Sequence, residues 1–255
     1  MPASARIITI ANCKGGCGKT TTSVNIAAEL AARGRRTLLL DLDPQGHATL
    51  ALGARDRARG VTAHDLLFGQ AAAAKPIRIE SVGVDVFPAD MTFRLPAAPQ
   101  RARALAETLG PIARNYDYVI IDTPPAAELP LVCALAAAHH TLAPTQLTPL
   151  ARDGVLRFSQ VFFYVSTQLN PDLRSLGIVP VQVDLRTRLH RAVLERLAKD
   201  FGSARLFPVV RSDIALAEAF DSGSPVRAFL PGSRGAEDYR QVVDRIIAEW
   251  EGQGI

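Results

Sequence analysis

The chain has 255 residues, of which 48% are apolar, and a formal net charge of +4 at pH 7, so it can bury a sizeable core. Only 6% of the residues are aromatic, which argues against a stacking platform for single-stranded nucleic acid. No apolar run approaches the about 20 residues of a membrane span, and three cysteines do not make a disulfide framework. Residues 1–6 run straight into the first expected strand, so no signal peptide is expected. Without a linker or an internal repeat, residues 1–255 are expected to form a single cytoplasmic domain.

The first expected strand, residues 6–11, runs into a glycine-rich turn and then a helix over residues 22–33 that stops at Gly34. Such a unit binds anions, because backbone N–H groups and the positive helix end converge where glycine lets the chain approach. We expect Lys19 to reach the β- and γ-phosphates of a nucleotide and the Thr20 hydroxyl to coordinate Mg²⁺. The expected phosphate-binding residues are Gly15, Gly16, Cys17, Gly18, Lys19, Thr20 and Thr21.

A second apolar strand is expected within residues 36–46, and it ends in Asp41-Leu-Asp43-Pro-Gln-Gly46. Residues at the carboxyl ends of strands in open α/β sheets face the ligand crevice. Asp43 can therefore orient a water, or a metal-bound water, against the γ-phosphate. Asp-Pro also begins turns that have no chemistry, but the preceding phosphate loop favours the functional interpretation.

A third motif lies in residues 116–125, where four residues, Tyr118 to Ile121, lead to Asp122 and then Thr-Pro-Pro. An aspartate at the end of a buried strand is a Walker B arrangement. Its carboxylate is expected to hold the Mg²⁺ shell, usually through water, because Mg²⁺ gives up its waters reluctantly.

The remaining segments alternate between strands and helices, which predicts an α/β fold: a doubly wound, mostly parallel sheet flanked by helices. His139 and His140 are expected at a helix end rather than in a metal site, because no third ligand is in view. The strand at 77–80 is a candidate edge strand. The expected strands are 77–80, 83–87, 141–145, 176–184 and 205–210, and the expected helices are 99–114, 129–138, 150–168, 187–199, 214–220 and 234–250.

The phosphate loop departs from the general pattern G-x-x-x-x-G-K-[ST], because Cys13 stands where the first glycine belongs and Lys14 precedes a glycine pair. This loop resembles the deviant Walker A motif of the ParA/MinD family of P-loop ATPases. The Asp41–Gly46 stretch and the run Ile-Asp-Thr-Pro-Pro are similar to the family's second and third motifs. The resemblance runs from residue 6 to about residue 250 but is specific only in these three motifs.

The resemblance implies an ATPase that uses ATP and Mg²⁺ and acts as an ATP-bound homodimer. In that family the extra lysine, here Lys14, reaches across the dimer interface to the other subunit's nucleotide. Asp43 takes the role of positioning the attacking water. The implied catalytic residues are thus Lys14, Lys19 and Asp43, the metal site comprises Thr20, Asp43 and Asp122, and Asp184 and Arg211 lie near the adenine.

The three cysteines are not expected to carry redox or metal chemistry. A helix N-terminus lowers a thiol's pKa, so Cys17 could be reactive, but we favour a small buried side chain in an apolar slot. Nitrogenase iron-protein relatives hold an iron–sulfur cluster with two cysteines per subunit outside the loop, and here Cys133 is the only one.

Basic residues concentrate between positions 185 and 211, with seven arginines and lysines against two acidic residues. Such a patch is typical of sequence-independent binding to a phosphate backbone. The resemblance implies nonspecific double-stranded DNA, with Arg186, Arg188 and Arg211 as candidate contacts. Relatives often carry a second basic residue where this chain has Ala215, and a solvated arginine-rich face is the alternative.

The two ends of the sequence bear on the subfamily. The first strand begins at residue 6, so no N-terminal helix-turn-helix domain of the larger plasmid ParA proteins is expected. The amphipathic segment 240–255 carries Asp244, Glu249 and Glu251 on its polar face, whereas a membrane-targeting helix should be basic. We expect it to pack on the sheet, in contrast to the tail of MinD.

These features predict a stand-alone ParA/Soj-type ATPase, nucleoid-associated in the cytoplasm. A ParB-like or cargo-adaptor partner is expected to stimulate its hydrolysis, and chromosome or plasmid partitioning is the leading function. Positioning of a protein cargo such as carboxysomes or chemoreceptor clusters, a MinD-like membrane-surface ATPase, and a metabolic phosphotransferase on the same fold are the alternatives.

Overall fold

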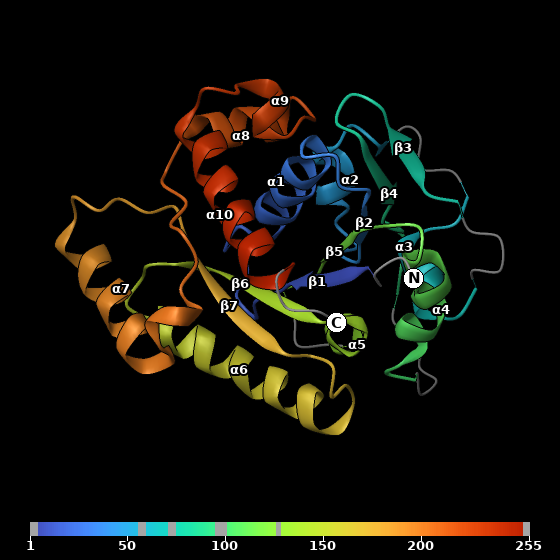
Figure 1. Ribbon diagram of the computed structural model, residues 1–255, viewed down its shortest axis with the longest axis horizontal. Helices are drawn as coiled ribbons and strands as arrows, with labels where there is room; N and C mark the ends of the chain where they lie inside the picture. Colours follow the sequence, from blue (N-terminus) through green and yellow to red (C-terminus); the bar gives the residue numbers. More distant parts are fainter. Residues whose placement is uncertain (1–4, 56–59, 71–74, 95–100, 126–128, 252–255) are drawn as a thin grey trace.

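The computed structural model describes residues 5–55, 60–70, 75–94, 101–125 and 129–251. Within them, seven strands form one sheet in the order β3-β4-β2-β5-β1-β6-β7 (Figure 1). Strand β3 lies at one end of this order, so the prediction of an edge strand at residues 77–80 is confirmed. Every pairing is parallel except that of β3 with β4. The strands are β1 (Arg6–Ile10), β2 (Thr37–Asp41), β3 (Ile77–Ile79), β4 (Val84–Phe87), β5 (Tyr118–Asp122), β6 (His140–Gln146) and β7 (Ser175–Val181).

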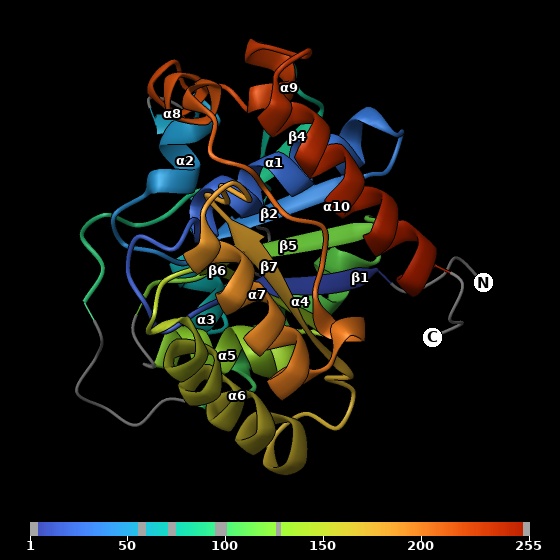
Figure 2. The same cartoon turned by 90° about the vertical axis from the view of Figure 1, so that its left-hand side faces the viewer.

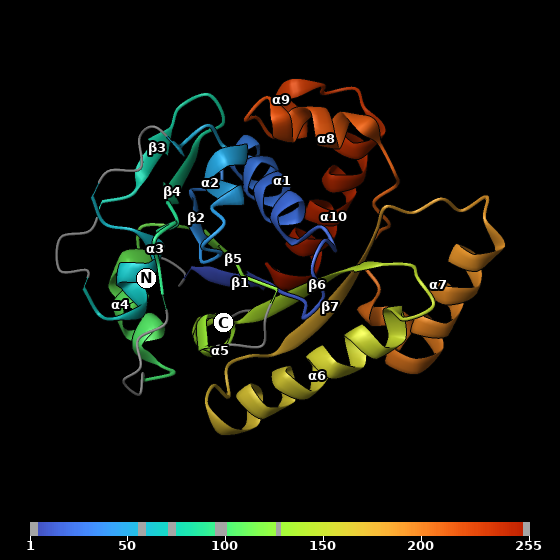
Figure 3. The same cartoon turned by 180° about the vertical axis from the view of Figure 1, so that it is seen from behind.

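Helices cover both faces of the sheet, which explains why β2 and β5 are buried along their whole length (Figure 3). One face carries α1 (Lys19–Ala32), α2 (His47–Ala51), α8 (Ile214–Asp221), α9 (Val226–Phe229) and α10 (Arg234–Trp250). The other carries α3 (Ala63–Leu67), α4 (Ala104–Ala113), α5 (Leu129–Ala137) and α6 (Ala151–Gln168). The α/β architecture with a doubly wound sheet is therefore confirmed.

The edge strand β7 is covered differently from the rest of the sheet. Helix α7 (Arg188–Phe201) lies beside α6 near this edge (Figure 2). The two helices and β7 share a small separate core, formed by Leu147, Val155, Ile178, Val183 and Leu197. The arginine-rich helix is thus attached to the main body by few apolar side chains and leaves most of its surface exposed.

The C-terminal helix α10 packs into the protein as expected. Its apolar face contacts α1 and is buried in the core through Tyr239, Val242, Val243, Ile246 and Trp250. No helix of the described residues is long and apolar enough to span a membrane. The apolar face that an amphipathic membrane helix would need is occupied by the protein's own core.

The predicted strand over residues 205–210 is wrong. Residues Ser203–Arg205 form a 3₁₀ turn, and the following segment forms two isolated bridges with β7 and its extension, Ile178 with Leu206 and Val183 with Arg211. Between them the Val210 N–H donates to the Pro180 carbonyl, but Pro180 has no N–H to donate in return, so a regular ladder is interrupted there.

Some element boundaries also differ from the sequence predictions. Helix α1 begins at Lys19, three residues earlier than predicted, and β7 ends at Val181 because Gln182 takes a left-handed φ of 55°. Asp184 therefore lies in the loop beyond the strand. Helix α4 starts at Ala104, and the beginning of the predicted 99–114 helix, residues 99–100, lies outside the described residues. Helices α2, α3 and α9 were not predicted, since four or five residues carry no usable period.

Candidate functional site

The glycine-rich loop joins β1 to α1 at the carboxyl edge of the sheet. Gly16 and Gly18 adopt left-handed φ values of 68° and 82°, which a side chain at either position would disfavour. Gly18 is the N-cap of α1 and supplies no capping side chain. The first N–H groups of α1 are therefore available to an anion, as the sequence predicted for a phosphate loop.

The two lysines of the loop occupy different environments. The Lys19 side chain is buried, and its Nζ donates to the Lys14 carbonyl at 3.3 Å. Lys14 is exposed, and its Nζ lies 3.5 Å from Thr148 Oγ1, in the segment after β6. One ammonium group thus lies inside the loop and the other lies on the outer surface.

Two polar side chains that the sequence did not single out hold the loop in place. Asn12 Nδ2 donates to the Pro144 carbonyl at 2.8 Å, and its Oδ1 accepts from the Lys14 N–H at 3.1 Å. Gln146 Nε2 donates to the Gly16 carbonyl at 3.0 Å and to Gln182 Oε1 at 2.8 Å. The loop is therefore tied to β6 at two points, and through Gln182 to the end of β7.

The expected metal-binding pair is in contact. The Thr20 hydroxyl donates to Asp122 Oδ2 at 2.9 Å, and Ser23 Oγ donates to Asp122 Oδ1 at 2.8 Å. Asp122 is fully buried at the end of β5, in register with Asp41 at the end of β2. Burial and then the Asp41 charge raise the pKa of Asp122 to about 8.

Asp41 and Asp43 occupy the same edge of the sheet. Asp41 Oδ1 accepts the Asp43 N–H at 3.2 Å, and its Oδ2 accepts from both the N–H and the hydroxyl of Thr49, at 2.8 and 2.7 Å. Burial raises the pKa of Asp41 to about 6. Asp43 is 8% exposed and accepts the Gln45 N–H. Asp41 thus anchors the turn that carries Asp43.

The donor set fits Mg²⁺ held jointly with phosphates rather than by the protein alone. In the parts of the chain that are described, no three His, Cys, Asp or Glu side chains converge on a metal-binding point. Mg²⁺ prefers oxygen ligands and usually takes one or two carboxylates plus substrate phosphates. The Thr20 hydroxyl and the Asp122 carboxylate supply such oxygens beside the open end of α1.

A cavity of about 620 Å³ opens beside the start of α1. Its walls combine apolar and polar side chains, with Gly18 and Thr21 at the phosphate loop and residues 210–213 opposite. Arg211 lines this cavity, as expected for a residue near a base, whereas Asp184 does not. The further lining residues are Val181, Gln182, Ile214, Leu216, Ala217, Phe220 and Tyr239.

Asp184 lines a second, more basic cavity of about 800 Å³ on the other side of Arg211. Its carboxylate accepts from Arg186 Nε at 3.0 Å and Nη2 at 2.9 Å, and this side-chain pairing lowers the Asp184 pKa to about 2. The Arg186 side chain is 91% exposed. Arg188 begins α7 and is also exposed. The cavity also gathers His190, Arg191, Arg211 and Arg234.

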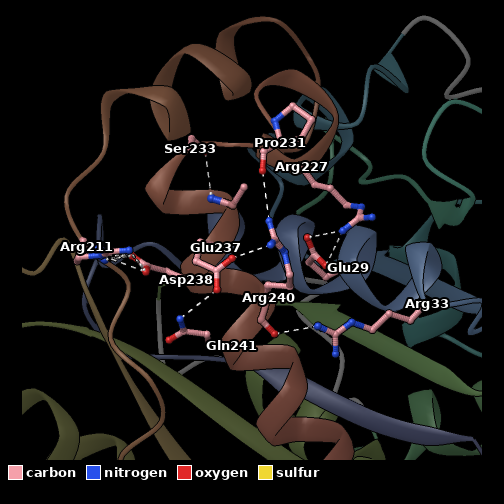
Figure 4. A network of polar contacts seen from close by, with 11 residues as sticks. Glu29, Arg33, Arg211, Arg227, Pro231, Ser233, Glu237, Asp238, Arg240 and Gln241 are labelled. Atoms are coloured by element: carbon pink, nitrogen blue, oxygen red, sulfur yellow. Dashed lines mark hydrogen bonds and ion pairs between the residues drawn. The ribbon is translucent and has the colours of Figure 1, made fainter.

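Arg211 belongs to both cavities. Its side chain is held by the buried Asp238, with Nη2 and Oδ1 at 2.6 Å, so it is less free than Arg186 to meet an external phosphate. Figure 4 shows this pair at the start of α10. Asp238 had no sequence signal, because nothing in a helical sequence marks which acidic residue turns inward.

The loop cysteines are buried or half-buried, and Cys17 Sγ contacts the Lys14 carbonyl at 3.1 Å. Burial raises the pKa of the Cys17 thiol despite the nearby Lys19. The direction agrees with a small buried side chain, not with an activated thiolate. Burial likewise raises the pKa of Cys133 to about 11.

Comparisons with known proteins agree with the motifs. Residues 5–175 match a family model described as an AAA domain. The chain is 39% identical to the chromosome-partitioning ATPase Soj of Thermus thermophilus, over 96% of this chain and 97% of that protein. The structure is also similar to that of cobyrinic acid a,c-diamide synthase from Mycobacterium smegmatis with bound ADP and magnesium, with 32% identity and a TM-score of 0.80 over 98% of both chains. It is similar as well to the cell division ATPase MinD of Pyrococcus furiosus, with 26% identity and a TM-score of 0.78 over 96% of this chain and 99% of that one.

Proposed function

The chain belongs to the ParA/Soj type of the ParA/MinD family of P-loop ATPases, and we propose that it forms an ATP-dependent sandwich dimer that binds DNA nonspecifically and positions a cargo. It hydrolyses ATP to ADP and phosphate, with Mg²⁺ as cofactor. Chromosome or plasmid partitioning is the leading role, since the similar Soj protein is a chromosome-partitioning ATPase.

The contrast between the two loop lysines carries the proposal. Lys19 is buried beside the open end of α1, where its ammonium group can neutralise phosphate charge in its own subunit. Lys14 is exposed and reaches toward Thr148. An ammonium group on the outer surface of the loop is suited to meet a nucleotide held by a second subunit that approaches this face.

The remaining catalytic roles fall to the Thr20 hydroxyl and to the carboxylates at the ends of β2 and β5. Thr20 and Asp122 would hold Mg²⁺, which supplies charge neutralisation for the departing phosphate. Asp43 would orient the attacking water, and Asp41 keeps the Asp43 turn in place through its backbone N–H. Because charge stabilisation depends on dimer geometry, hydrolysis by the isolated protein should be slow and should rise with a ParB-like or cargo-adaptor partner.

The basic cavity supports nonspecific DNA as the partner that the dimer binds. Arg186 lines this cavity with Arg191 and Arg234, and Arg188 is exposed at the start of α7; such a cluster attracts a phosphate backbone without reading its sequence. Of the three predicted contacts, Arg211 is the least available, because Asp238 holds its guanidinium. We therefore assign DNA binding to the first two arginines and place the protein on the nucleoid in the cytoplasm.

The alternatives make different demands on the same surfaces. A membrane-bound ATPase needs an exposed amphipathic helix, and the apolar face of α10 is buried against α1. A protein cargo, such as a carboxysome or a chemoreceptor cluster, is compatible with every feature above and differs only in the partner. A synthase acting on a small molecule would consume ATP only when its acceptor is present.

The proposed dimer is tested by sedimentation of the purified protein with ATP and with ADP, in the wild type and in the Asp43→Ala, Lys14→Ala and Lys75→Ala variants. We expect a dimer with ATP in the wild type and in Asp43→Ala, where slow hydrolysis prolongs it. Lys75 is exposed and lies just before β3, so Lys75→Ala should match the wild type as a control. A monomer with ATP in all variants would refute the proposal.

A further inference from the structure

The wall of the 620 Å³ cavity opposite the phosphate loop is a short segment, residues 210–213, that lies outside the regular sheet. Its backbone is hydrogen-bonded to β7 and its extension, by the Val210 N–H to the Pro180 carbonyl at 2.7 Å and through the isolated bridge of Val183 with Arg211. Further contacts come from α10. Asp213 Oδ2 accepts the Gly235 N–H at 2.8 Å, and Asp238 holds Arg211.

Asp238 is committed entirely to this support. Its side chain is 4% exposed, and its carboxylate accepts the Arg211 backbone N–H at 2.8 Å, Nε at 3.0 Å and Nη2 at 2.6 Å. Figure 4 shows the carboxylate of Asp238 directed from α10 onto the Arg211 side chain. A buried carboxylate that accepts from both backbone and guanidinium fixes the position of the loop and the rotamer of the arginine together.

The next residue connects the same turn of α10 to α1, the helix that follows the phosphate loop. The Tyr239 hydroxyl lies 3.1 Å from Thr22 Oγ1 in the first turns of α1, and Tyr239 lines the cavity. Two consecutive residues of α10 therefore hold opposite sides of the cavity. Asp238 holds the side formed by Arg211, and Tyr239 holds the side formed by α1.

We propose that Asp238 is a positioning residue for the nucleotide base. It holds the Arg211 guanidinium as a flat, polar wall of the base cavity, against which a purine ring can stack, and it does so without contact with the phosphates. This inference rests on the proposed function, because it takes the cavity beside Gly18 and Thr21 as the place of the base. It also makes Arg211 part of the nucleotide site rather than of the DNA surface.

The test separates base binding from phosphate binding. Dissociation constants for ATP and for inorganic tripolyphosphate, both with Mg²⁺, are measured for the wild type and for the Asp238→Ala, Asp238→Asn, Arg211→Ala and double Ala variants. We expect Asp238→Ala to weaken ATP binding roughly tenfold or more, the scale of one lost hydrogen bond to a charged group, and to leave tripolyphosphate binding unchanged. Asp238→Asn keeps one acceptor oxygen, so its affinity for ATP should lie between those of the wild type and Asp238→Ala.

Glu29→Gln is the matched control. Glu29 is a second buried carboxylate on this face of the sheet, and it pairs with Arg227 of α9 at 3.0 Å, as Figure 4 also shows. It lines neither cavity. Its replacement should lower the unfolding temperature without changing the ratio of the ATP and tripolyphosphate constants. An unfolding temperature measured for every variant confirms that folded protein is being compared.

The double variant decides whether Asp238 acts through Arg211. If it does, the double Ala variant binds ATP no more weakly than Arg211→Ala. The inference would be overturned if Asp238→Ala left the ratio of the ATP and tripolyphosphate dissociation constants unchanged, whether both stayed the same or both rose equally. Additive losses of ATP affinity in the double variant would overturn it as well. A wild type that binds neither ligand would instead refute the proposed function.

Discussion

Lys19 Nζ donates to the backbone carbonyl of Lys14 at 3.3 Å, while the Lys14 side chain is exposed and its own Nζ lies 3.5 Å from Thr148 Oγ1. The same five-residue interval therefore brings one lysine into the phosphate site and directs the other away from it. With a nucleotide bound, Lys19 would exchange the carbonyl for phosphate oxygens, whereas Lys14 has no such partner in its own site.

This division predicts two different failures. Lys19→Ala should weaken ATP binding roughly ten- to hundredfold, because a buried ion–phosphate contact is lost. Lys14→Ala should keep ATP binding by the monomer and lose roughly 10²- to 10³-fold in hydrolysis, because transition-state charge is left unneutralised. Binding of a fluorescent ATP analogue and phosphate release measure the two effects. Normal binding and hydrolysis in both variants would show that the site assignment is wrong.

The DNA contacts are tested by charge removal against a matched arginine. Arg186→Ala and Arg188→Ala should each weaken DNA binding and reduce the slope of log affinity against log salt by about 1, as each removes one phosphate contact. Arg36→Ala is the control. Arg36 is also exposed and paired with an aspartate, Asp117, but it lies just before the amino end of β2, whereas Arg186 follows the carboxyl end of β7. An equal loss in Arg36→Ala would mean that only net charge matters.

The fold can be probed by two glycines with opposite surroundings. At Gly177 in β7 an added Cβ would lie 2.7 Å from Leu142 Cδ2 and closer still to Phe207, whereas at Gly154 in α6 it would meet nothing within 4 Å. Gly177→Ala should lower the free energy of unfolding by about 1–3 kcal/mol through overpacking. Gly154→Ala should raise it by about 0.5–1 kcal/mol. Urea denaturation measures both, and an unaffected Gly177→Ala would contradict the tight contact of β7 with Phe207.

The buried His140 predicts a pH dependence of stability. It stacks on Trp250 with the ring centroids 4.2 Å apart, and burial followed by the nearby His139 lowers its pKa from 6.5 to about 4. Between these values the unfolded chain binds more protons than the native one, so His140's contribution is full above pH 6.5 and is lost as the pH falls.

The wild-type protein should therefore lose about 2 kcal/mol through this residue between pH 7 and pH 5. Because other groups titrate as well, the useful quantity is the difference in unfolding free energy between the wild type and His140→Gln, which should shrink as the pH falls. His47→Gln, at an exposed position, serves as the control. A difference that stays constant with pH would contradict the low pKa of His140.

Three motifs predicted the centre of this molecule well, because each couples a local pattern to a strand end. The mostly parallel sheet with β3 at its edge confirms the predicted fold, and the structure brings Thr20 into contact with Asp122, while their role in binding Mg²⁺ stays a prediction. Parallel strands bring their carboxyl ends to one edge, so Thr20 and Asp122, 102 positions apart in the chain, could be expected near one another.

The parts that could not be predicted depend on contacts distant in sequence. Residues 205–210 have the composition of a strand, but the partner strand β7 presents Pro180, which has no N–H to donate, and only isolated bridges form. Asp184 seemed to end a strand, yet the left-handed Gln182 ends β7 earlier and directs the chain to a different cavity. Asn12 and Asp238 act through hydrogen bonds and an ion pair to residues distant in the sequence, which leave no periodicity in it.

The central claim is an ATP switch that controls DNA binding, and its most direct measurement is DNA affinity with ADP, with ATP, and with ATP in the Asp43→Ala variant, across a salt series. We predict binding that requires ATP, persists in Asp43→Ala and weakens steeply with salt. Binding that is equal with ADP and ATP would contradict the switch. The absence of binding in all three states would reduce the arginine-rich surface around Arg186 to a solvated face and redirect the search to a small-molecule or membrane-bound partner.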